Sequence, residues 1–219
     1  MQEEAITIIN SFHSFLGNKD FPCVAAKDAL VKGNIEVMVA THLACPADDK
    51  AILYFIYKFT QAYRNAGKGF YSAAVIFKGP DDINEAMFDT LMWQRLQALR
   101  SLDAQYYKYD ERVDADPLSG NFSFSLMEEG FFIVAMHPNS NRPSRQFKYP
   151  VLVFNPHAQF EMMKRTAGYE KMKTIIRKRD LAYSGSINPM LTNFGEASEA
   201  YQYSGRVYDA EWQCPFKNQ

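Results

Sequence analysis

Four short apolar runs are the feature that most constrains how this chain folds. They are IEVMVA (35–40), FYSAAVIF (70–77), GFFIVAM (130–136) and PVLVF (150–154). Each run is shorter than an ordinary helix and rich in β-branched or aromatic residues, which is typical of buried strands. NFSFS (121–125) alternates polar with apolar residues just before the third run, so these two segments predict an antiparallel hairpin.

Helical patterns separate and follow these strands. A turn into a short helix is expected within FPCVAAKDAL (21–30), and a short turn near 196–203. Apolar residues at helical spacing predict longer helices over Glu3–Leu16, Ala47–Ala66, Asp81 or Asp82 to about Leu102, 157–166 and 169–181. The chain contains neither G-x-G-x-x-G nor G-K-[ST], which disfavours a doubly wound nucleotide-binding sheet. We therefore expect residues 1–219 to form a single α+β domain with a mainly antiparallel central sheet flanked by helices.

Composition and charge exclude several classes of function. Hydrophobic residues make up 47% of the 219 residues, which indicates a cored globular protein, and a net charge of −1 gives no reason to expect a nucleic-acid partner. Residues 1–10 are acidic where a signal peptide would be basic, and no apolar run reaches the roughly 18 residues of a membrane span. We therefore expect a cytoplasmic protein without a membrane partner. Nothing in the sequence indicates the oligomeric state.

The three cysteines, Cys23, Cys45 and Cys214, match neither a zinc pattern nor a disulfide framework. Small buried thiols are the common outcome for such residues. Cys23 in FPC and Cys214 in CPF are nevertheless each next to a proline, and a cysteine thiolate is one of the side chains that hold haem iron.

The segment HPNSNRPSRQFKY (137–149) is a polar loop directly after an apolar strand, and it contains His137, Arg142 and Arg145. Loops at strand ends often carry function, and a guanidinium group binds carboxylates through two parallel hydrogen bonds. The two arginines therefore suit a ligand that carries carboxylates. The alternative is a pair of solvated arginines, which would contribute little.

The segment FNPHAQFE (154–161) combines a helix start with a candidate metal ligand. Asn155 is expected to cap the helix and Pro156 to occupy its first position. His157 and Glu161 are four residues apart and would share one helix face, and a carboxylate is a common partner of a metal-bound imidazole. The alternative is a half-buried histidine hydrogen-bonded near the cap. Together with His137 and a glutamate, His157 would also complete a two-histidine, one-carboxylate iron site.

These segments resemble one known family when they are taken together. FPC, HPNSNRPSRQFKYPVLVFNPHAQFE, NPMLTNFGEASEAYQYSGR and CPF are similar to the YqcI/YcgG family over nearly the whole chain, most strongly over 131–216. That family includes haem-dependent N-hydroxylases of guanidine-bearing amino acids, such as those of D-cycloserine and guanitoxin biosynthesis. The resemblance implies a b-type haem with its iron, O₂ as oxidant, and a small guanidino or amino substrate such as arginine or a derivative. The sequence shows no flavin or nicotinamide domain, so electrons are expected from a separate donor or from peroxide.

The resemblance also implies roles for the histidines and arginines. His157 is expected to be the axial ligand of the haem iron, with Glu161 as its partner. His137 is expected to be a catalytic residue of the distal pocket, or the axial ligand in place of His157. Arg142 and Arg145 are expected to pair with the haem propionates.

The same resemblance assigns the substrate to the segment 185–206. Glu196 and Glu199 are expected to bind the substrate guanidinium, because a buried cation needs a paired anion, and Tyr203 and Arg206 would line the same pocket. The two glutamates have a simpler alternative as acids that support a helix start. For the whole protein, the alternatives are a haem carrier or sensor without turnover and a non-haem iron oxygenase.

Overall fold

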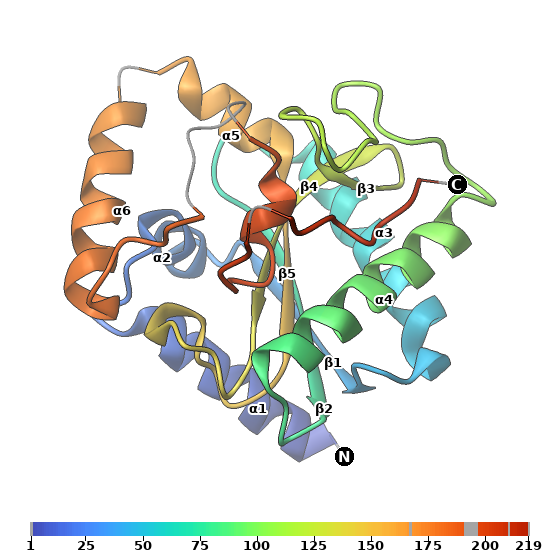
Figure 1. The fold of residues 1–219 in the computed structure, drawn as a ribbon, viewed down its shortest axis with the longest axis horizontal. Coiled ribbons are helices and arrows are strands. Elements are labelled where there is room, and N and C mark those ends of the chain that lie inside the picture. The colour runs from blue at the N-terminus through green and yellow to red at the C-terminus, as the bar shows by residue number, and fades with distance from the viewer. Residues whose placement is uncertain (1, 167, 191–196, 210, 219) are drawn as a thin grey trace.

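The four apolar runs and the NFSFS segment contribute the strands of one five-stranded sheet at the centre of the molecule (Figure 1). The structure is a computed structural model that describes residues 2–166, 168–190, 197–209 and 211–218. The strand order is β1-β2-β5-β4-β3, with β1 and β2 parallel and the other neighbours antiparallel. The strands are β1 (Ile35–His42), β2 (Ser72–Gly79), β3 (Phe124–Leu126), β4 (Glu129–Met136) and β5 (Val151–Pro156). The predicted α+β class with a mainly antiparallel sheet is confirmed.

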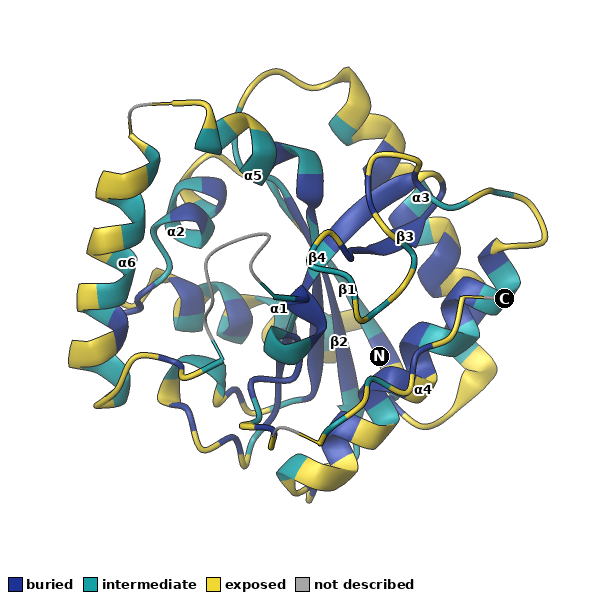
Figure 2. Cartoon of the chain, turned by 45° about the horizontal axis from the view of Figure 1, so that its top comes forward, coloured by how far each residue is buried: buried dark blue, intermediate teal, exposed yellow. Residues whose placement is uncertain are grey.

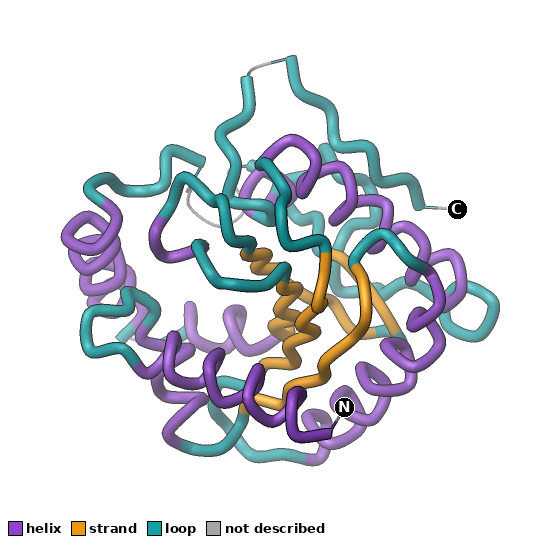
Figure 3. Tube along the Cα trace, turned by 90° about the horizontal axis from the view of Figure 1, so that it is seen from below, coloured by secondary structure: helices purple, strands orange, loops and turns teal. Residues whose placement is uncertain are grey.

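Helices cover both faces of this sheet (Figures 1 and 3). One face packs against α3 (Asp49–Asn65) and α4 (Glu85–Asp103). The other face is covered by α1 (Gln2–Gly17), α2 (Val24–Val31) and α6 (Tyr169–Ser184), while α5 (His157–Lys164) continues directly from β5. Short 3₁₀ turns lie at Pro46–Asp48, Pro143–Arg145 and Glu199–Gln202.

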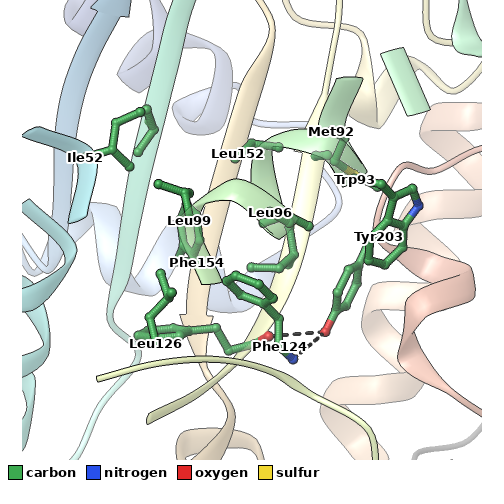
Figure 4. Packing of buried hydrophobic residues seen from close by; sticks show 14 of the residues in the cluster. Ile52, Met92, Trp93, Leu96, Leu99, Phe124, Leu126, Leu152, Phe154 and Tyr203 are labelled. Carbon is green, nitrogen blue, oxygen red and sulfur yellow. Dashed lines mark hydrogen bonds between the residues drawn. The ribbon is translucent and has the colours of Figure 1, made fainter. Parts of the chain in front are cut away.

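Alternation along the strands explains why two separate apolar clusters form. On β4, Ile133 is fully buried in the cluster beneath α3 and α4, whereas its neighbour Val134 packs against the cluster beneath α1. Figure 4 shows the first cluster, in which Leu96 of α4 packs against Phe154 of β5. Both faces of the sheet are therefore apolar, and both need a helical layer to exclude water.

Two predicted helix caps are wrong. α4 is capped by Asn84, whose side chain accepts the Met87 N–H, and not by Asp81 or Asp82. Asn155 does not cap α5, because antiparallel pairing with β4 extends β5 through Pro156. The Asn155 side chain instead accepts a hydrogen bond from the Ser72 hydroxyl and donates to the Phe132 carbonyl. Sheet pairing has therefore overridden the local capping signal.

Candidate functional site

A cavity of about 330 Å³ lies between the sheet and the layer formed by α1, α2 and α6. Its walls are mostly apolar, and we call it the sheet cavity. The sheet contributes Phe132, Val134 and Val153, and the helical layer contributes apolar side chains that include Phe12, Leu16, Phe21, Ala26 and Ile176. A mostly apolar cavity with a few polar groups is typical of a site for a small molecule or cofactor.

Cys23 supplies one of those polar groups. It is the N-cap of α2, where its sulfur accepts the Ala26 N–H at 3.4 Å. Burial raises the pKa of the Cys23 thiol, despite the opposing hydrogen bonds from Ala26 and Ala25. The ligand-free thiol is therefore protonated, whereas coordination to a metal ion would deprotonate it outright. Its place at a helix N-terminus also favours the thiolate.

Arg142 lines the same cavity and is held by a buried ion pair. Its Nη2 lies 2.6 Å from Oδ2 of Asp180 on α6, and it also donates to the Ser186 carbonyl. The hydroxyls of Ser144 and Ser184 donate to the other oxygen of Asp180. Asp180 was not among the residues expected from the sequence, although an acid that ends the basic run IIRKRD was an available signal.

Arg145 is the second cation of the sheet cavity. Within the described residues, its side chain forms hydrogen bonds only with backbone carbonyl groups. Its guanidinium donates to the carbonyls of Ala135, Gln202 and Tyr203. Burial, and then the nearby charge of Arg142, lower the pKa of Arg145 to about 10. A half-buried cation of this kind is stabilised by an anion, so the cavity wall favours a ligand that carries a carboxylate.

His157 lies in a different cavity, of about 380 Å³, on the other side of α5. Asp110, Arg112 and Glu161 line this second cavity, while the lining of the sheet cavity does not include the histidine. As the spacing predicts, Nε2 of His157 faces Glu161, with its Oε1 at 3.7 Å. Nδ1 faces a second carboxylate, Oε2 of Glu199, also at 3.7 Å.

His137 lies at the opposite end of the β4–β5 pair. Met136 pairs with Val151, whereas Phe131 pairs with Pro156, so the two histidines are separated by roughly 20 Å at a rise of about 3.3 Å per residue. They cannot face one iron. The interpretations in which His137 is distal to a haem held by His157, or joins it in a non-haem iron site, are therefore wrong. His137 instead stacks on Phe88, with 4.4 Å between the ring centroids.

The residues expected to bind substrate do not form one pocket. Glu196 lies outside the described residues. Glu199 is buried and accepts the Tyr203 hydroxyl at 2.8 Å, and Tyr203 is a fully buried core residue that stacks on Trp93 (Figure 4). Arg206 extends toward α4, where its Nη1 lies 3.8 Å from Asp89. Glu199 and Tyr203 thus support the core next to His157, and Arg206 lies elsewhere.

Comparison with known proteins identifies the family. The model of the YqcI/YcgG family matches residues 12–217. The chain belongs to this family. Protein YqcI of Bacillus subtilis (strain 168) is 28% identical to this YqcI/YcgG chain over 219 residues, which cover 94% of this chain and 85% of that protein. No solved structure matches the chain at a significant level. Within its described residues, no helix is both long and apolar enough to cross a membrane.

The side chains that line the sheet cavity are of the kinds that would hold the haem that the resemblance to N-hydroxylases implies. It combines apolar walls with a thiol at a helix N-terminus and two guanidinium groups. A thiolate is a known axial ligand of haem, and guanidinium groups bind carboxylates such as propionates. His157, the ligand favoured from the sequence, faces the second cavity and shares no cavity with Arg142 and Arg145. Cys23 is therefore the side chain that the geometry favours, and the FPC motif was its signal.

Proposed function

We propose that this protein is a haem-dependent oxygenase that N-hydroxylates a small guanidino or amino compound, with haem held in the sheet cavity. The observation that carries this proposal is the convergence of Cys23 and Arg145 on one apolar cavity. Cys23 is the N-cap of α2, whereas Arg145 ends the 3₁₀ turn between β4 and β5, and the two are more than a hundred residues apart in sequence. The resemblance to guanidine N-hydroxylases supports the substrate class.

Three residues of the chain would hold the haem, each in a different role. Cys23 would ligate the iron, with α2 favouring its negative charge through the helix N-terminus. Arg145 would pair with one propionate, and this pairing would relieve its buried charge. Arg142, already fixed by Asp180, would present its guanidinium edge to the other propionate. Bound haem would supply the iron at which O₂ is activated, and the apolar walls would exclude bulk water.

The test begins with protein prepared from haem-fed cells. We expect about one b-type haem per chain, as one coordination pocket requires. Cys23→Ser should lose most of the haem or change its spectrum away from that of a thiolate complex. His157→Ala should retain the haem content and the spectrum of the wild type. Haem that is kept in Cys23→Ser and lost in His157→Ala would return the ligand to α5. Folded wild-type protein without haem would contradict the proposal itself.

Turnover separates an oxygenase from a haem carrier. With arginine, O₂ and a chemical reductant, the oxygenase should form an N-hydroxylated product that mass spectrometry detects as a gain of one oxygen atom. The same mixture without haem-loaded protein is the control. Stable haem binding with no product from arginine or other guanidino and amino compounds would favour the carrier.

A further inference from the structure

The outward face of α6 carries an unusual concentration of positive charge for a chain whose net charge is −1. α6 contains five basic and two acidic residues. One of the acids, Asp180, points inward and is already paired with Arg142. Lys171 and Lys178 are exposed, and within the described part of the chain no carboxylate forms an ion pair with either of them. Their charge is therefore directed at solvent.

Neighbouring α2 extends this positive surface. Lys27 Nζ and Arg179 Nη2 both donate to the carbonyl of Lys19, at 2.7 and 2.5 Å. Burial lowers the pKa of Lys27, and the charge of Arg179 lowers it further although nearby Asp20 opposes this, so the two cations repel each other across one carbonyl. We call the set Lys19, Lys27, Lys171, Lys178 and Arg179 the basic face.

Apolar side chains lie among these cations. Ile175 is 39% exposed and Leu181 is 50% exposed. Lys171, Ile175 and Lys178 follow helical spacing and share one stripe, and the outward turns of α6 are visible as exposed in Figure 2. Exposed apolar residues surrounded by like charges are typical of a transient protein interface that is steered by electrostatics.

The inner side of the same helix forms a wall of the sheet cavity. Ile176 and Asp180 line that cavity. A helix with its side chains is about 10–12 Å across, so a partner on the basic face would be about that far from the cavity. The charged surface and the proposed haem site are thus opposite sides of one element.

We propose that the basic face of α6 and α2 is the docking surface for a small acidic one-electron carrier protein. This inference rests on the proposed function, because the haem iron would receive the electrons. Each docking event oxidises the carrier by one electron and reduces the iron by one electron. Two electrons and two protons then balance one turnover, in which one oxygen atom of O₂ enters the N–H bond and the other leaves as water.

The test uses a plant-type [2Fe–2S] ferredoxin as the acidic probe and the full chain as its partner. Affinity is measured by calorimetry between 50 and 200 mM NaCl. The double variant Lys171→Glu with Lys178→Glu should bind at least about tenfold more weakly at the lowest salt, and salt should affect its remaining affinity less. The matched control reverses two exposed lysines of α3, Lys50→Glu with Lys58→Glu, and should change affinity less than about twofold.

Stopped-flow reduction of the haem distinguishes the two proposals. Ferredoxin should reduce the α6 double variant at least about tenfold more slowly than wild type, while dithionite should reduce both at the same rate. Equal loss in the α3 control would show a global charge effect and overturn the docking surface. Failure of wild type to bind ferredoxin, or tighter binding to anionic vesicles or duplex DNA, would also overturn it. The calorimetry needs no haem, so a colourless protein would overturn only the proposed function.

Discussion

Arg145 links the loop after β4 to the segment that follows the 3₁₀ turn at Glu199–Gln202. Its guanidinium donates to the Ala135 carbonyl on β4 and to the carbonyls of Gln202 and Tyr203. The last two residues are 57 and 58 positions from Arg145 in the sequence, so one side chain joins two distant parts of the chain. Carbonyl contacts do not neutralise its charge, and burial together with the nearby charge of Arg142 lowers the pKa of Arg145 to about 10. A residue that looks like a solvated loop cation in the sequence is therefore part of a cavity wall.

The three cysteines should differ in reactivity, because only Cys45 is exposed. Burial raises the pKa of Cys23 and raises that of Cys214 to about 12. With iodoacetamide at pH 8, we expect Cys45 to react at least about tenfold faster than either of the two half-buried thiols, since the thiolate is the nucleophile. Peptide mass spectrometry gives the rates. Haem loading should protect Cys23 further and leave Cys214 unchanged, and fast labelling of Cys23 would contradict the buried site.

His137 predicts a dependence of stability on pH. Burial lowers its pKa below the usual 6.5, although Glu85 and the Ile83 carbonyl oppose this shift. Below pH 6.5 the unfolded chain therefore binds a proton that the folded chain does not. The free energy of unfolding accordingly decreases as the pH is lowered, by at most about 1.4 kcal/mol per pH unit. His137→Gln should flatten that slope between pH 6.5 and 5 in urea unfolding. An unchanged slope would show that other groups produce it.

At the scale of elements, the turn of the β3–β4 hairpin has a strained backbone. Its two turn residues, Met127 and Glu128, have φ of 54° and 55°. This left-handed conformation matches the twist of the strands, but it is costly for residues other than glycine or asparagine. The Arg64 guanidinium donates to the carbonyls of both turn residues, which helps to hold the turn.

The hairpin predicts a stabilising substitution. Glu128 is exposed, so Glu128→Gly removes little packing while relieving the strain of a left-handed residue. We expect the free energy of unfolding to rise by about 1 kcal/mol. Glu128→Ala is the control, since it removes the same carboxylate but keeps the Cβ, and it should give no such gain. Equal effects in chemical denaturation would assign the change to charge instead of backbone strain.

For the whole molecule, the two helical layers are not equivalent. The layer of α3 and α4 packs against the sheet through a large continuous cluster that includes Trp93 and Phe154. The layer of α1, α2 and α6 leaves the sheet cavity open beside a smaller cluster. The second layer is therefore the part of the fold that a bound ligand would complete.

Filling the cavity should separate stability from ligand binding. We expect Val134→Trp to leave ligand-free stability unchanged or raise it by about 0.5–2 kcal/mol, as cavity-filling changes do. For wild type, haem at one hundred times its Kd should raise the free energy of unfolding by about 2.7 kcal/mol, and Val134→Trp should abolish this gain. Val39→Trp, on β1 outside the cavity lining, is the matched control and should keep the gain. Thermal unfolding with and without haem measures both effects.

Most of the elements follow from local sequence patterns. The apolar runs are strands, the hairpin forms where alternation predicted it, and α1 and α3 begin and end within two residues of their expected limits. The interaction of His157 with Glu161 also follows from helical spacing alone. These features depend on the 2-residue and 3.6-residue periods of the backbone, which neighbouring residues are sufficient to set.

Only the tertiary structure decides which side chains share a site. Register between β4 and β5 separates His137 from His157, because six paired residues of strand lie between their positions. Packing of α2 against α6 brings Cys23 beside Arg142 and Arg145, far from it in sequence. Sequence periodicity shows which face of an element is apolar, but it does not show which other element covers that face. That choice depends on non-local packing, and here it places Cys23, and not His157, in one cavity with the two arginines.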